Sequence, residues 1–121
     1  MKPPSQAVRT LMEVGVASVG AGLTQQAMTI FEGIEAVRPD SEAPMIGAAL
    51  IYLNSNAPEE AVKVLREGAL TRNPASLEAK MFLGLALRMA GRNSECDNVI
   101  KELNATGNTQ AKNFAAALTA R

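Results

Sequence analysis

A repeated spacing of small residues constrains the fold of this chain more than any other feature. Small residues recur at Gly15, Ala49 and Gly84, and twelve positions later at Ala27, Ala61 and Cys96. Large apolar residues follow that second set by four positions, at Phe31, Leu65 and Ile100. The successive offsets of 34 and 35 residues match the period of a stacked helix–turn–helix repeat. This period predicts an all-α fold that serves binding rather than chemistry.

The composition suits closely packed helices. Of the 121 residues, 47% are hydrophobic and only 3% are aromatic, with no Trp. Alanine, which is abundant, lets helix axes approach closely and has the highest intrinsic helix propensity. A chain of this length is expected to form one domain around one continuous core.

Charge and side-chain chemistry argue against several classes of function. Lys and Arg number 12, as do Asp and Glu, and the cations form no stripe that would replace the counterions of a nucleic acid. The absence of His removes the commonest general base and metal ligand together. We therefore expect no enzymatic activity, no metal or cofactor, and no nucleic-acid partner.

The apolar segments and the single cysteine bear on the compartment. The longest strongly apolar stretch, residues 46–53, is far too short to span a bilayer. The N-terminus lacks the basic start, apolar core and cleavage site of a secretory signal. One cysteine cannot form an internal disulfide, which fits a reducing compartment. These features predict a cytoplasmic protein with no membrane partner.

Helix start and stop signals divide the chain into a tail and one domain. Residues 1–6 read as a flexible tail, and residues 7–121 as a single domain with units at about 8–41, 42–76 and 77–108. Ser41 is suited to cap a helix, and Pro44 and Pro58 suit first turns. Equivalent turn positions hold residues that tolerate positive φ, namely Gly22, Asn56 and Gly91.

A last helix is expected at about 109–119. It would place Ala111, Phe114, Ala115 and Leu118 on one side and cover the open end of the stack, as a terminal repeat must.

The repeated positions resemble the tetratricopeptide repeat (TPR) over residues of about 8 to 108. The first unit matches with Gly15, Gly22, Ala27, Phe31 and Pro39, and the second with Ala49, Asn56, Ala61, Leu65 and, one residue late, Pro74. The third matches with Gly84, Gly91, Cys96 and Ile100, and its closing proline is absent. The Trp usual near the start of each unit is replaced by Leu11, Met45 and Lys80. The resemblance implies three TPR units in a right-handed stack with a C-terminal capping helix.

In TPR arrays the first helix of each unit lines the concave face. The resemblance therefore implies the partner-binding residues Met12, Val16, Val19, Ile46, Leu50, Leu53, Met81, Leu85 and Met89, the last beside Arg88. A groove of this kind is expected to accept the apolar side of a helix or an extended hydrophobic segment, and methionine adapts well to such partners. Two alternatives stay open: burial of these residues in the core, and their coverage by the terminal helix or by a second copy of the chain.

Other distinctive residues have structural explanations. Cys96 is expected to be a small buried hydrophobe and Tyr52 a packing residue. A charged run reads as a solvated outer side, comprising Glu59, Glu60, Lys63, Arg66 and Glu67. Three further cations would either border the groove or face solvent: Arg72, Arg88 and Arg92.

Small three-unit proteins with an apolar groove resemble the TPR chaperones of bacterial type III secretion, which serve virulence. The length favours the subclass that holds the needle subunit over the longer translocator chaperones. The resemblance implies a cytoplasmic chaperone that captures the amphipathic helix of its client and prevents premature assembly, in some cases with a second small co-chaperone. A translocator chaperone and a generic TPR scaffold or homodimer stay open as alternatives.

Overall fold

The computed structural model describes residues 29, 32–33 and 41–119. The tail at 1–6, the unit expected at 8–41 and the candidate residues Met12, Val16 and Val19 lie outside the described residues. Within the described part, the chain is helical and contains no strand, which confirms the predicted all-α class. The predicted array of three TPR units stays a prediction, because the first unit is not described.

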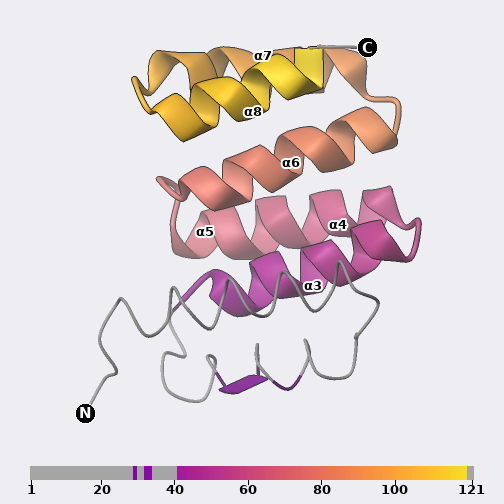
Figure 1. Ribbon diagram of the computed structural model, residues 1–121. Coiled ribbons are helices and arrows are strands. Elements are labelled where there is room, and N and C mark those ends of the chain that lie inside the picture. The colour runs from indigo at the N-terminus through magenta and orange to yellow at the C-terminus, as the bar shows by residue number, and fades with distance from the viewer. Residues whose placement is uncertain (1–28, 30–31, 34–40, 120–121) are drawn as a thin grey trace.

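The helices follow one another as two pairs and a single last helix. The first pair consists of α3 (Ala43–Asn54) and a longer helix of three segments, α4 (Pro58–Lys63), η1 (Val64–Ala69) and α5 (Leu70–Arg72). The second pair is α6 (Leu77–Met89) and α7 (Asn93–Ala105), and α8 spans Thr109–Thr119. Figure 1 shows that α3, α6 and α8 run in one direction, whereas the α4–α5 helix and α7 run in the other. The central helix is α6, because it packs against α3, α4, η1, α7 and α8.

The repeated small residues lie where these helices meet. Ala49 and Ala61 are 0% exposed and Cys96 is 1% exposed, which confirms the expected burial of the cysteine. Gly84 is also buried, and a Cβ atom placed on it would lie 2.7 Å from Leu118 Cδ1 and 3.2 Å from a methyl of Val99. A side chain at this position would therefore force the side chains of Leu118 and Val99 to move.

Local signals place most helix ends where the sequence predicts them. Ser76 caps α6 by accepting a hydrogen bond from the Ala79 N–H at 3.2 Å. Asn56 and Gly91, predicted to tolerate positive φ, adopt φ values of 58° and 75° after α3 and α6. Ser41 accepts a hydrogen bond from the Ala43 N–H at 3.1 Å, although Glu42 is the residue at the cap position.

A π-helical segment, η1, interrupts the second helix of the first pair. The Leu70 N–H donates to the carbonyl of Leu65, five residues earlier, instead of four. Pro74 follows Leu65 by nine residues, whereas Pro39 follows the equivalent Phe31 by eight. A π-turn contains more residues than an α-turn, so η1 accommodates the extra residue that lengthens the repeat from 34 to 35.

The last helix, α8, packs onto both helices of the second pair. Its bounds agree with the predicted range, and Ala111, Ala115 and Leu118 are buried on one side as expected. Phe114 is half-buried and meets Phe82 of α6 edge to face, with ring centroids 6.2 Å apart. This geometry is favourable for two aromatic rings. The α8 helix therefore extends the core of the stack at its C-terminal end.

Replacing Gly84 with Val is expected to lower the free energy of unfolding by about 1–3 kcal/mol, because overpacking forces the side chains of Leu118 and Val99 to move. The measurement is urea denaturation followed by circular dichroism. Ala116→Val is the control, because residue 116 is exposed on α8 and receives the same β-branched side chain. Equal stability of Gly84→Val and the wild type would contradict the close packing described above.

Candidate functional site

An apolar stripe runs along one side of α6. Met81, Leu85 and Met89 are spaced by four residues and so lie along one side of the helix. Met89 is 44% exposed, and Met81 and Leu85 are half-buried. Leu53, at the end of the neighbouring α3, is half-buried as well. We call these four residues the apolar face.

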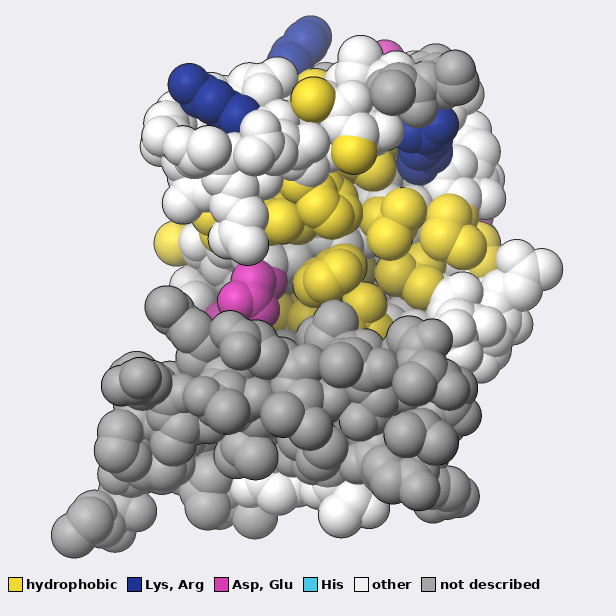
Figure 2. All heavy atoms as spheres, in the orientation of Figure 1, with side chains coloured by type: hydrophobic (Ala, Val, Ile, Leu, Met, Phe, Trp, Pro, Cys, Tyr) yellow, Lys and Arg dark blue, Asp and Glu magenta, His cyan; other side chains and the backbone are white. Residues whose placement is uncertain are grey.

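Figure 2 shows hydrophobic side chains gathered in a hollow over α3 and α6. Large apolar side chains that stay open to solvent in this way are typical of surfaces that bind partners. The predicted groove itself stays a prediction, and the structure shows that four of its predicted residues, Leu53, Met81, Leu85 and Met89, are half-buried or exposed.

Two of the predicted groove residues lie in the core instead. Ile46 is 1% exposed and Leu50 is 9% exposed, so neither offers surface to a partner in this structure. The reason is the composition of α3, in which residues 46–53 are apolar on every side and are covered on more than one face. Of the six predicted residues that the structure describes, Leu53, Met81, Leu85 and Met89 remain available.

Charged groups lie at both ends of the apolar face. Glu78, in the first turn of α6, is exposed and three residues before Met81. At the other end, the Arg88 guanidinium donates to the Ala117 carbonyl at 3.0 Å and to the Leu118 carbonyl at 2.7 Å. Arg88 thus joins the C-terminal ends of α6 and α8 and places a positive charge beside Met89.

Tyr52 does not have the packing role expected of it. Its side chain is 40% exposed and lines a surface depression of about 540 Å³ between α3 and the α4–η1 helix. Ala48, Val64 and Gly68 form the apolar part of the depression. Three charged residues border it, namely Glu60, Lys63 and Glu67.

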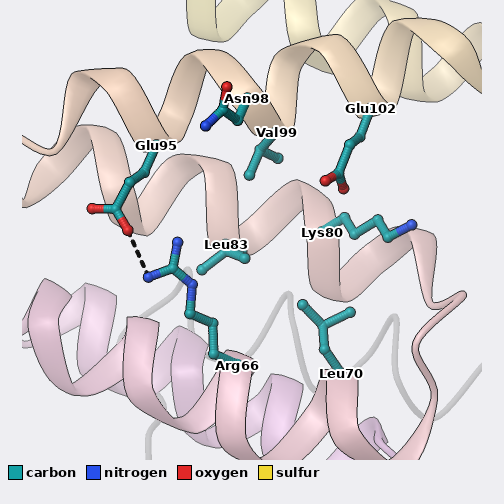
Figure 3. A pocket seen from close by; sticks show the side chains of 8 residues that line it. All are labelled: Arg66, Leu70, Lys80, Leu83, Glu95, Asn98, Val99 and Glu102. Carbon is teal, nitrogen blue, oxygen red and sulfur yellow. Dashed lines mark ion pairs between the residues drawn. The ribbon is translucent and has the colours of Figure 1, made fainter.

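A second depression, a cleft of about 380 Å³, lies between the two helical pairs on a side of α6 formed by other residues. Leu70, Leu83 and Val99 form its apolar floor. As Figure 3 shows, its border carries the cations Arg66 and Lys80, the carboxylates Glu95 and Glu102, and the neutral amide of Asn98. Because cations and carboxylates balance there, the cleft shows no preference for an ion of either sign.

An ion-pair network crosses from the first helical pair to the second at this cleft. A carboxylate oxygen of Glu95 in α7 lies 2.8 Å from a guanidinium nitrogen of Arg66 in η1. The Glu95 carboxylate also accepts two hydrogen bonds from the Arg92 guanidinium, at 2.5 and 2.9 Å. Arg92 also donates to Glu59 of α4 at 2.9 Å. Hydrogen bonds from Arg92 and then Arg66 hold the pKa of Glu95 below its usual range, and Glu95 and Glu59 raise the pKa of Arg92.

This network corrects one reading of the charged residues. Glu59, Glu60, Lys63, Arg66 and Glu67 are exposed, as the sequence predicts. Glu59 and Arg66 nevertheless bind residues of the next pair, more than 25 positions along the chain. Arg72 and Arg88, which were expected either to border the groove or to face solvent, also bind specific groups. Arg72 donates a hydrogen bond to the Ser41 carbonyl at 3.0 Å, and Arg88 donates one to the Leu118 carbonyl at the end of α8. Sequence spacing within one helix could not identify these pairs.

The described side chains provide little for catalysis. No group of three or more Cys, Asp or Glu residues there is arranged to hold a metal ion. Cys96 is 1% exposed, and a thiol buried in apolar surroundings is unreactive. Among the described helices, none is both long and apolar enough to cross a membrane.

The chain matches no protein-family model and no curated protein.

Replacing Glu95 with Gln is expected to lower the free energy of unfolding at pH 7, because Gln cannot neutralise Arg66 and Arg92. The folded state keeps Glu95 charged to lower pH than the unfolded state, in which the pKa is about 4.3. The contribution of Glu95 is therefore present above that pH and is lost as the pH falls through it and below. Urea denaturation should show the difference between wild type and variant shrinking between pH 7 and pH 3.

The matched control is Glu60→Gln, which removes the same charge from an exposed residue of α4 outside the network. It should change the stability at pH 7 less than Glu95→Gln does. Identical pH profiles for the two variants would show that the network contributes nothing to stability.

Proposed function

We propose that the protein is a chaperone-like binding protein that holds the amphipathic helix of a protein client on its apolar face. The observation that carries the proposal is the stripe of Met81, Leu85 and Met89 along one side of α6, in which Met89 is 44% exposed and the other two residues are half-buried. A helix whose apolar residues repeat every three or four positions would cover such a stripe.

The chemistry of the stripe supports a helical client. Met81 and Met89 have flexible, polarisable side chains, which adapt to partners of differing shape. Burial of apolar surface supplies about 25 cal/mol per Å², so an interface of roughly 1,000 Å² has a large gross driving force. Most of that driving force offsets the cost of association and of ordering the client, which leaves moderate affinity.

The client class follows from the resemblance of the repeat to the chaperones of type III secretion. In this proposal the client is the needle subunit, whose assembly requires the same apolar helix side that the chaperone covers. Binding would keep the subunit in the cytoplasm as a soluble complex until secretion. A translocator client, or a second copy of this chain on the same face, is a different outcome of the test below.

The test is co-expression of the chain with the needle subunit of the organism that encodes it. Wild-type protein is expected to keep the subunit soluble in a complex, measured by size-exclusion chromatography and light scattering. Met89→Glu is expected to weaken the complex about tenfold, because it places a charge at the most exposed residue of the apolar face, which the client helix would bury. Met89 is chosen because it is exposed, whereas Ile46 and Leu50, which were also predicted to bind a partner, are buried.

Asn104→Glu is the control, because residue 104 is exposed near the C-terminal end of α7 and also receives a carboxylate there. It should bind as the wild type does. Unchanged binding by Met89→Glu, or polymerisation of the subunit in the presence of wild-type protein, would contradict the proposal. A stable dimer of the chain that Met89→Glu dissociates would favour the homodimer instead.

A further inference from the structure

We infer that the depression beside Tyr52 binds an arginine side chain of a protein partner. It is a second binding surface, because it lies between α3 and the α4–η1 helix and shares no residue with the apolar face. The inference is carried by an exposed aromatic ring, by the sign of the charges that border the depression, and by the ion pairs that the neighbouring arginines form elsewhere.

The first observation is the exposed ring of Tyr52. It is the only tyrosine of the chain, and its side chain is 40% exposed and lines the depression. Tyrosine and arginine are enriched among the residues that contribute most to protein interfaces, and a guanidinium stacks well on an aromatic ring. Ala48, Val64 and Gly68 are half-buried beside the ring and offer an apolar surface to the aliphatic part of an arginine side chain.

The second observation is that the border of the depression favours a cation. Glu60 and Glu67 are exposed there, and Lys63 is the one cation among the described lining residues. Within the part of the chain that the structure describes, none of these three side chains forms an ion pair. Two carboxylates against one ammonium give the border a net negative charge, which a cationic ligand would complement.

The third observation is that the arginines nearest to this border pair with other residues. Arg66 of η1 pairs with Glu95 at 2.8 Å, at the cleft between the helical pairs. Glu59, the neighbour of Glu60, binds Arg92 at 2.9 Å. The α4–η1 helix therefore directs one set of charges to the second helical pair and carries the other set at the depression. An arginine supplied by a partner would complete this second set.

The shape of the depression suits one long side chain and the backbone that carries it. Its volume of about 540 Å³ lies within the range of about 300–1,000 Å³ that is usual for binding sites. The π-helical segment η1 contributes Val64, Glu67 and Gly68, and π-helical segments are frequent at functional sites. Arginine fits better than lysine, because the planar guanidinium can stack on the ring and direct its N–H groups to a carboxylate together.

The experiment measures the fluorescence of Tyr52, which reports on this depression alone because the chain has one Tyr and no Trp. The probes are capped tripeptides, namely Leu-Arg-Leu, Leu-Lys-Leu and Leu-citrulline-Leu, where citrulline has the shape of arginine without its charge. Leu-Arg-Leu is expected to bind with a millimolar dissociation constant, about five- to tenfold more tightly than the citrulline peptide. Leu-Lys-Leu should bind more weakly than Leu-Arg-Leu, because an ammonium lacks the flat surface that stacks on the ring.

Substitutions at the border should change the preference for arginine over citrulline in opposite directions. Glu60→Gln and Glu67→Gln should each lower that preference about two- to threefold, and Lys63→Gln should raise it by a similar factor. Added salt should lower it as well. Glu102→Gln is the control, because it removes a carboxylate from an exposed residue of α7 outside the depression. It should leave the preference unchanged.

Several results would overturn the inference. Equal binding of the arginine and citrulline peptides, or a preference that neither glutamate variant changes, would show that the carboxylates do not select the ligand. Equal binding of the lysine and arginine peptides would overturn the choice of arginine. If millimolar Leu-Arg-Leu changes neither the fluorescence of Tyr52 nor the amide NMR signals of Ala48 and Gly68, the depression binds no such side chain. None of these results concerns the apolar face, so the proposed function is tested separately by Met89→Glu.

Discussion

The close approach of helices at small residues is the constraint on which the rest of the structure depends. Ala49, Ala61, Gly84 and Cys96 are all buried, and at Gly84 even one added carbon would lie 2.7 Å from Leu118. Because α6 packs against α3, α4, η1, α7 and α8, a change in its distance from them would alter the whole stack. Packing of this density transmits a local volume change to its neighbours.

The same constraint determines which side of α6 stays open. Gly84, Ala86 and Leu87 use the packed sides of the helix, while α8 covers part of the rest through Phe114 and Leu118. Met81, Leu85 and Met89 are what remains. The ion-pair network of Glu95 lies on a different side, at the cleft between the pairs. Exposed ion pairs of this kind stabilise a protein only modestly. The apolar core therefore holds the two helical pairs together, and the ion-pair network adds to that stability.

Much of the fold could be predicted because its signals are local. Positive φ at Asn56 and Gly91 and the bounds of α8 depend on residues within one or two turns of each other. The burial of Ile46 and Leu50 depends on what covers α3. The sequence indicated this burial, because residues 46–53 are apolar on every side of the helix. The only sign of the π-helix in the sequence was the position of Pro74, one residue later than the repeat predicts.

The candidate site was harder to predict, because its limits are set by residues distant in sequence. Periodicity placed Met81, Leu85 and Met89 on one side of α6, but not the contact of Arg88 with the end of α8, about 30 residues away. Cross-pair ion pairs such as Arg66–Glu95 leave no pattern within a single helix.

Methionine oxidation tests most directly the central claim that this side of α6 is open and binds a client. Dilute hydrogen peroxide followed by mass spectrometry gives the rate at each residue. In the isolated chain, Met89 at 44% exposure should oxidise faster than the half-buried Met45 and Met81. A bound client should protect Met81 and Met89 and leave the rate at Met45 unchanged. Oxidation of Met89 no faster than that of Met45 in the isolated chain, or no protection by a bound client, would contradict the account.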